Sequence, residues 1–200
     1  KVTQPYNSFV EIPMSREFSD FQALIEQALR LGAFRFEPTL VSDQRLSPYF
    51  FNSGVFNAFC DLDSLTRRWF TRVVELIEDG TLDIPSFCDD IVFLGIAEKG
   101  IAPAIALGTS MYYEPNFNGR FRFAKYAFFR KHPKGHGEGG EIVGASLSGM
   151  RVVVFDDTLT AGKSALETFR KVRGMGGTPL AFFTVFDREE RTSNLKDPRQ

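Results

Sequence analysis

The 200-residue sequence predicts an α/β domain in which helices flank a mainly parallel central sheet. Short, continuously apolar segments alternate with helical ones in its second half. The predicted strands are 91–95, 123–129, 151–155 and 180–186. Uniformly apolar strands separated by helices are typical of a parallel sheet that is covered on both faces. At this length we expect one domain with a full hydrophobic core.

The first half of the chain predicts a helix followed by short extended segments. Apolar residues recur at helical spacing over 18–29, where Ser19 with Gln22 fits a capping box and Gly32 fits a C-cap. The aromatic segment 46–59 is interrupted by Pro and Gly, which favours short strands or an edge hairpin.

Three further helices complete the predicted pattern. One spans 61–79, begins with an Asp and is followed by a Gly. The second covers most of 101–113, and the third covers 162–176 and ends in glycines. No internal repeat, low-complexity tract or interdomain linker interrupts the pattern, so a single domain is predicted.

The charge balance excludes several function classes. The 24 Lys and Arg residues against 25 Asp and Glu give a formal net charge of −1. No global basic field for nucleic acid or an anionic membrane is expected, and no acidic field for a polycation. A content of 43% apolar and 24% charged residues indicates a globular chain rather than a disordered one.

Cysteine usage and hydropathy predict a cytoplasmic protein. Cys60 and Cys88 form no C-x-x-C motif, so we expect two free, buried thiols rather than a disulfide framework. No segment approaches the roughly 18 uninterrupted apolar residues of a membrane span. The N-terminus shows no signal-peptide pattern.

The segment 152–164, VVVFDDTLTAGKS, carries the most specific chemistry. A buried strand is predicted to end at Phe155, and Asp156 and Asp157 follow at the edge where open α/β sheets place their ligands. Backbone N–H groups and hydroxyls at the start of the next helix suit a phosphate, while carboxylates accept hydrogen bonds from sugar hydroxyls. A sugar phosphate is therefore the predicted ligand. The simpler interpretation is a capped helix, which needs only one acid.

A second segment, 128–144, places basic residues before a glycine-rich stretch. Between Glu114 and Glu138 there are six Lys and Arg residues and no acid. A run of charge is usually a solvated face. The glycines instead favour a mobile basic loop that closes over a polyanion and excludes water.

These segments carry a family resemblance. Residues 152–164 resemble the phosphoribosyl-pyrophosphate (PRPP) motif of type I phosphoribosyltransferases, and the H-G-E-G-G in 128–144 resembles the basic loop of orotate phosphoribosyltransferases. The similarity is collinear from about residue 38 to 191 and includes SPYFFNSGVFN, FLGIAEKGIAPAIAL and FDREER. It implies a type I phosphoribosyltransferase fold with one domain over 1–200: a small hood subdomain from roughly 1–60 and a core from roughly 61–191.

The resemblance also implies a reaction. Orotate and PRPP would give orotidine 5′-monophosphate and pyrophosphate, in pyrimidine (UMP) biosynthesis. The transition state would resemble an oxocarbenium ion, so catalysis would be positioning plus stabilisation of leaving-group charge. Mg²⁺ would enter largely on substrate oxygens, and no direct protein ligand is predicted. A homodimer with shared active sites is implied, because the family's basic loop reaches the neighbouring subunit.

The resemblance assigns each site residue a role. Asp156 and Asp157 would face the ribose hydroxyls and Lys99 the pyrophosphate. The basic residues that would neutralise the leaving group are Arg130, Lys131, Lys134 and His136. PRPP would also be bound by Thr158, and its 5′-phosphate by Thr160, Ala161, Gly162, Lys163 and Ser164. Orotate would contact Phe50, Phe51, Thr160 and Arg188.

Simpler interpretations remain for four of these residues. Lys99 fits an ordinary surface lysine in a turn, Phe50 and Phe51 fit a hairpin core, and Arg188 fits a surface salt bridge.

Two other functions stay open. One is a phosphoribosyltransferase for a purine or another base, which H-G-E-G-G and S-P-Y-F-F disfavour. The other is a weakly active or non-catalytic PRPP-binding regulator on the same fold, which Lys99 and the basic loop disfavour. A nucleic-acid-binding protein is least favoured, because no recognition motif accompanies the basic stretch.

The sequence departs from the family pattern at Val41, where family members usually carry a catalytic Lys. Arg45 lies nearby, but the spacing has gained a residue. Family members also continue beyond the base-contacting Arg, so a shortened C-terminus is expected.

Restoring a cation near the reacting centre should increase turnover. Val41→Lys is therefore expected to raise kcat with orotate and PRPP in a steady-state assay. An unchanged kcat would show that this position does not limit catalysis.

Overall fold

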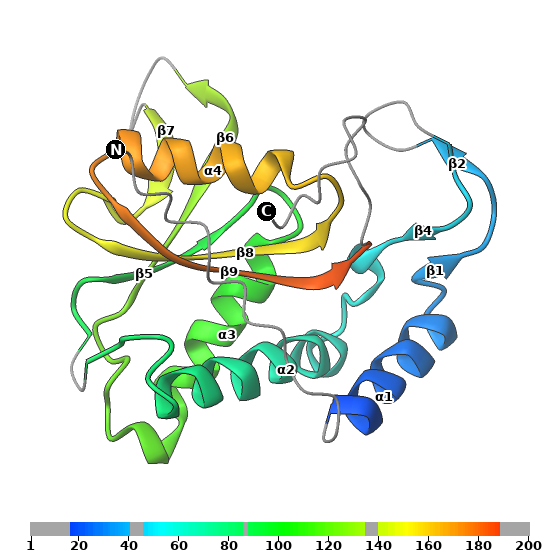
Figure 1. Cartoon of the computed structure of the whole chain (residues 1–200), viewed down its shortest axis with the longest axis horizontal. Coiled ribbons are helices and arrows are strands. Elements are labelled where there is room, and N and C mark those ends of the chain that lie inside the picture. The colour runs from blue at the N-terminus through cyan, green and yellow to red at the C-terminus, as the bar shows by residue number, and fades with distance from the viewer. Residues whose placement is uncertain (1–16, 41–45, 86–87, 135–139, 189–200) are drawn as a thin grey trace, which may run out of the picture.

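The computed structural model describes residues 17–40, 46–85, 88–134 and 140–188. Its centre is a five-stranded sheet in the order β7-β6-β5-β8-β9 (Figure 1). Four strands are parallel, and β7 is antiparallel to β6, so the predicted mainly parallel sheet is confirmed. The strands are β5 (Ile91–Gly95), β6 (Lys125–Lys134), β7 (Gly140–Gly144), β8 (Arg151–Leu159) and β9 (Thr178–Asp187).

Helices cover both faces of the sheet. On one face lie α2 (Phe59–Glu78) and α3 (Ile101–Tyr113), and on the other lies α4 (Lys163–Gly174) (Figure 1). Successive side chains of a strand point to opposite faces. Phe155 therefore packs with Trp69 of α2, while Val154 packs with Val172 of α4. This double burial explains why the central strands are uniformly apolar.

A smaller unit, which we call the hood, lies beside the sheet and comprises α1 and β1–β4 (Figure 1). It contains α1 (Glu17–Arg30) and two antiparallel pairs: β1 (Phe34–Arg35) with β4 (Phe50–Phe51), and β2 (Thr39–Leu40) with β3 (Leu46–Ser47). Its apolar centre joins the core through β9, because the ring of Phe186 lies 5.2 Å from the rings of Phe34 and Phe51.

The pairing within the hood decides between two alternatives that were predicted for the segment 46–59. The segment 46–59 forms short strands, but β3 and β4 pair with β2 and β1 rather than with each other. Pro48 separates the two strands and Pro38 separates their partners. Proline lacks an N–H to donate to a ladder. Each ladder is therefore short, and the two prolines lie between one ladder and the other.

Helix bounds and cysteine burial correct two predictions. Helix α1 begins at Glu17, so Ser19 lies inside the helix rather than at the N-cap position. Cys88 is buried as predicted, but Cys60 is exposed in the first turn of α2. The apolar spacing of that helix turns its opposite face to the core, and position 60 falls on the solvent side.

Three strands differ from their predicted form, and one of them is β6, which spans 125–134 rather than 123–129. β8 continues past Phe155 to Leu159, so the acids at 156 and 157 lie within a strand rather than after it. β9 extends alongside and supplies backbone partners up to the pair Leu159 and Asp187. β7 was not predicted at all, because its sequence GEIVG begins and ends with glycine.

The ring of Phe155 offers a test of the core. It is fully buried and lies 5.2 Å from Trp69 and 5.5 Å from Phe93 and Phe183, centroid to centroid. Phe155→Ala is expected to lower the free energy of unfolding by about 3–5 kcal/mol, because the lost contacts leave a cavity. Urea denaturation followed by circular dichroism measures this change.

The matched control is Phe59→Ala, because Phe59 is 92% exposed. That variant should stay within about 0.5 kcal/mol of the unsubstituted protein. Equal losses for the two variants would contradict the core described here.

Candidate active site

The candidate site lies at the carboxyl ends of β5 and β8. These strands are neighbours, and the chain leaves β5 into α3 on one face and β8 into α4 on the other. Such a divergence opens a crevice where α/β sheets bind their ligands. The turn after β5 carries Lys99, and the end of β8 carries Asp156 and Asp157.

The two acids face opposite sides of the sheet, because they are consecutive in a strand. Asp156 lies on the α4 side, where its Oδ2 accepts a hydrogen bond from the Ser164 hydroxyl at 3.3 Å. Asp157 lies on the other side, where its Oδ2 accepts one from the Ser53 hydroxyl at 2.6 Å. One side chain therefore meets the phosphate turn, and the other meets the hood.

Burial makes Asp156 an unusual acid. It is only 8% exposed, and this desolvation, with the negative charge of Asp157, raises its pKa to about 7. Hydrogen bonds from the Asp157 N–H at 2.9 Å and from Ser164 oppose the rise by favouring the charged form. Near neutral pH the Asp156 carboxyl is therefore partly protonated.

The turn after β8 leads directly into the N-terminus of α4. Thr160, Ala161 and Gly162 form this turn, and Gly162 precedes the helix with φ 71°. That left-handed conformation suits glycine and lets the chain turn sharply into the helix. The first-turn N–H groups and the helix dipole make this end attractive to an anion. Lys163 is 85% exposed and pairs with Glu167 at 3.9 Å.

Close packing against β8 holds the turn that carries Lys99. The Ile96 N–H donates to the Phe155 carbonyl at 2.8 Å. A Cβ on Gly100 would lie 2.4 Å from that same carbonyl oxygen, so only glycine fits there. Lys99 Nζ lies 3.8 Å from Asp157 Oδ2, at the edge of the site. Lys99 is therefore an exposed lysine in a turn, and its ammonium lies beside an acid of the site.

The hood adds two residues that the sequence analysis did not single out. Asn52 Oδ1 accepts a hydrogen bond from Lys99 Nζ at 3.1 Å, and Ser53 binds Asp157. The turn signal Asn-Ser-Gly at 52–54 marked a loop, but nothing local indicated where that loop would dock. Phe50 lies beside them, with Lys99 Nζ 5.7 Å from its ring centroid.

The residues predicted to contact orotate differ in their burial and in their contacts. Phe51 is 4% exposed and belongs to the hood core, as the simpler interpretation expected, whereas Phe50 is half-buried at the site. Arg188 is buried and follows β9, where its Nη2 donates to the Ser47 hydroxyl and its Cζ lies 4.8 Å from the Tyr49 ring centroid. Arg188 therefore fastens the hood to β9 and is not a surface residue.

The basic segment forms a hairpin of β6 and β7 rather than a loop alone. Lys134 pairs with Gly140 in register, while 135–139, including His136, lie outside the described residues. Arg130 is half-buried, and Lys131 Nζ lies 3.7 Å from Glu98 Oε1. The hairpin therefore reaches the turn of Lys99. Val41 and Arg45 also lie outside the described residues.

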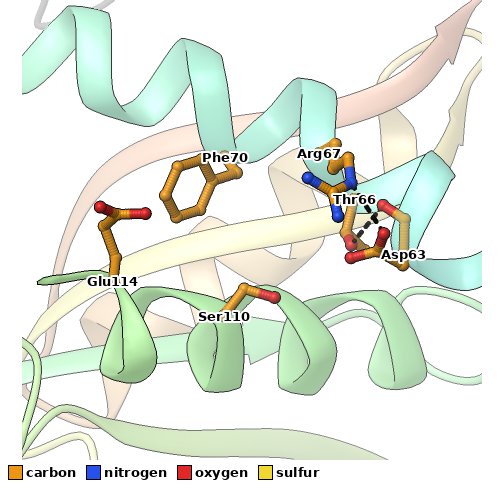
Figure 2. Close-up of a pocket in the computed structure, with 6 residues that line it drawn as sticks. All are labelled: Asp63, Thr66, Arg67, Phe70, Ser110 and Glu114. Carbon is orange, nitrogen blue, oxygen red and sulfur yellow. Dashed lines mark hydrogen bonds and ion pairs between the residues drawn. The ribbon is translucent and has the colours of Figure 1, made fainter.

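Two cavities lie away from these residues. One, of about 140 Å³, opens between α2 and α3 and is lined by Phe70, the Asp63–Arg67 pair, Thr66, Ser110 and Glu114 (Figure 2). The other, of about 260 Å³, lies over α3 and the start of β6. Neither contains a candidate site residue. Among the described residues, the candidate site is assembled from separate elements that polar contacts join.

Metal and membrane features are absent from the described part of the chain. Within it, no three His, Cys, Asp or Glu side chains gather closely enough to hold a metal ion. None of the helices described above has the length and hydropathy needed to cross a bilayer.

Comparison with known proteins identifies the family. The chain is 38% identical over 177 residues to an orotate phosphoribosyltransferase from Bordetella petrii, covering 88% of this chain and 70% of that protein. A Francisella tularensis orotate phosphoribosyltransferase structure is similar with a TM-score of 0.62 at 28% identity, covering 88% of this chain and 76% of that one.

A Mycobacterium tuberculosis orotate phosphoribosyltransferase in complex with PRPP shares the fold, with a TM-score of 0.52 at 20% identity over 84% of this chain and 96% of that one. No family model matches the sequence. On its sequence relatives and its fold, the chain belongs to the orotate phosphoribosyltransferase family.

Proposed function

We propose that the chain transfers the 5-phosphoribosyl group of PRPP to orotate, giving orotidine 5′-monophosphate and pyrophosphate for UMP synthesis. The observation that carries this proposal is the meeting of an acid pair, an anion-binding helix end and a lysine turn at one edge of the sheet. PRPP presents hydroxyls, a phosphate and a pyrophosphate, which are the groups that these three elements suit. Membership of the orotate phosphoribosyltransferase family indicates that orotate is the base.

PRPP would lie across the carboxyl end of β8. Its ribose hydroxyls would donate to Asp156 and Asp157, and its 5′-phosphate would accept from the N–H groups at the start of α4. The phosphate-binding residues are proposed to be Thr160, Ala161, Gly162, Lys163 and Ser164, with Thr158 beside them. Because the turn and the acids belong to one segment, the two ends of the ribose phosphate are held at a fixed separation.

Departure of pyrophosphate would be assisted by cations from two directions. Lys99 lies at the turn after β5, and the β6–β7 hairpin brings Arg130 and Lys131 from the side. Lys134 and His136 would complete this set. As a nitrogen of orotate attacks the anomeric carbon, these groups would stabilise the growing negative charge of the leaving group. In the proposed homodimer, the hairpin serves the neighbouring subunit's site.

Orotate would lie between the hood and the Lys99 turn. Phe50 offers a half-buried ring there, and Thr160 offers a hydroxyl at the end of β8. Arg188 provides the cation for the anionic pyrimidine, although its guanidinium already bonds to Ser47 of the hood. Phe51 would support the pocket from behind, as part of the hood core.

Mg²⁺ would bind through the oxygens of PRPP, supplying charge neutralisation for the pyrophosphate. The described residues suit this arrangement, because they offer the acid pair for hydroxyls but no carboxylate cage. We further propose that residues 1–200 form a single phosphoribosyltransferase domain with the hood as its smaller part. The free cysteines at 60 and 88 support a cytoplasmic location.

Orotate-dependent consumption of PRPP in the presence of Mg²⁺ tests the function. Pyrophosphate release should require orotate and should not occur with adenine, hypoxanthine or uracil in its place. Release with a purine would indicate another base specificity, and PRPP binding without turnover of any base would favour a regulator. Lys99→Met should lower kcat by about 100-fold, because a cation close to the leaving group is lost.

Lys125→Met is the matched control for that substitution. Lys125 opens β6 at the other end of the sheet, where its Nζ bonds to the Asp89 carbonyl. It should leave kcat within about twofold. Equal losses of activity in the two variants would remove the catalytic assignment of Lys99.

The raised pKa of Asp156 predicts a stability cost. A carboxyl with a pKa of about 7 when folded, against an ordinary 3.8, binds its proton more tightly in the folded chain. Its contribution to stability is therefore present at low pH and is lost as pH rises from about 4 to 7. Asp156→Asn cannot titrate, so its stability relative to the unsubstituted protein should rise by on the order of 2 kcal/mol between about pH 5 and pH 8.

Urea unfolding at the two pH values measures this difference. The same variant should bind PRPP more weakly, since a charged acceptor is lost. Parallel pH dependences of stability for the two proteins would contradict the burial of an ionisable group at position 156.

A further inference from the structure

The contact between the hood and β8 is short and shielded from water. Ser53 is 6% exposed, and its hydroxyl donates to Asp157 Oδ2 at 2.6 Å. The two residues are far apart in sequence and belong to different parts of the fold, the hood turn and the central sheet. A short hydrogen bond to an ionised carboxylate is among the strong ones.

We propose that Ser53 is a positioning residue, which holds the Asp157 carboxylate in place for the ribose of PRPP. This inference rests on the proposed function, because it gives Asp157 the ribose as its ligand. Ser53 itself need not touch the substrate. Ser53 acts through Asp157 Oδ2, the oxygen that Lys99 Nζ also approaches.

The turn that carries Ser53 is anchored on both sides. Phe51 precedes it and Phe56 follows it, and each is 4% exposed within the hood core. The Asn52 N–H donates to the Ala33 carbonyl at 2.8 Å, and Asn52 Oδ1 accepts from the Gly54 N–H at 3.2 Å. The hydroxyl is therefore presented by a fixed backbone, which suits it to orient a partner rather than to follow one.

Asp157 has little else to hold it within the described part of the chain. Lys99 Nζ approaches the same oxygen only to 3.8 Å, which is beyond hydrogen-bond distance, and its direct hydrogen bond goes to Asn52. Lys99 is also 42% exposed, so its charge is partly screened by water. Ser53 thus supplies the direct donor, and Lys99 supplies a nearby charge.

The donor also affects how the acid pair shares its charge. Among the described residues, the charged and titratable groups that interact with Asp157 are Asp156, its neighbour in β8, and Lys99 from the turn after β5. Removing the Ser53 hydroxyl leaves the negative charge of the pair less stabilised. The pair then takes up its proton at a higher pH, so PRPP binding should begin to weaken at a higher pH as the solution is acidified.

Titration calorimetry with PRPP and Mg²⁺ across about pH 6 to 9 tests the proposal. Ser53→Ala should weaken PRPP binding by about tenfold near neutral pH and move the acid limb of the affinity profile upward. Ser53→Thr keeps the hydroxyl and should restore the position of that limb. Ser110→Ala is the control, because it removes a serine hydroxyl that donates within α3, to the Ala106 carbonyl. That control should change neither the affinity nor the profile.

A double-mutant cycle separates positioning from a structural role. If Ser53 acts through Asp157, Ser53→Ala should cost little further affinity in an Asp157→Asn background. An equal loss of affinity in both backgrounds, or an unmoved acid limb, would overturn the proposal. Because binding is the readout, failure of the protein to turn over orotate would count against the proposed function and leave this result interpretable.

Discussion

The burial of an ionisable acid at the end of β8 is the constraint on which the rest of the site depends. Asp156 is 8% exposed and must find its partners in the protein, and it finds them in Ser164 and in its own neighbour's N–H. These bonds fix the turn into α4. The turn in turn fixes the N-terminus of α4, which we propose binds the phosphate. A core strand that ends in an apolar residue would need none of these contacts, and a buried acid with a raised pKa is typical of a functional site.

The hood completes what the sheet begins. Its aromatic core packs on Phe186 of β9, and two polar contacts fasten its edge, Ser53 to Asp157 and Ser47 to Arg188. The proposed sugar and base sites are therefore both held by contacts with the same edge of the hood. A shift of the hood would disturb both, since the same short segment, 47–53, carries both contacts.

Much of this arrangement follows from local sequence. The strand at 91–95 and the helix at 101–113 were predicted at their observed bounds, because burial on both faces leaves a uniform apolar pattern. By contrast, β6 and β8 continue to residues 134 and 159, beyond their predicted ends at 129 and 155. The acids at 156 and 157 and the turn after them were identified from one continuous segment. Ser53 and Asn52 were not identified from the sequence, because their partners lie far along the chain. Ser53 bonds to Asp157, more than a hundred residues away, and Asn52 bonds to Lys99 across the boundary of the hood. The pairing of β4 with β1 also decides that Phe51 is buried and Phe50 is half-buried, and the sequence did not predict this pairing.

The charge of the acid pair is the most direct test of this account. Carbon-13 NMR of selectively labelled aspartates, followed through a pH titration of the unliganded protein, reports on the two side-chain carboxyls. The account predicts that Asp156 takes up a proton near pH 7, well above an ordinary aspartate, while the signal of Asp157 responds to that event. Titration of Asp156 near its ordinary value of 3.8 would contradict the buried acid on which the site is built.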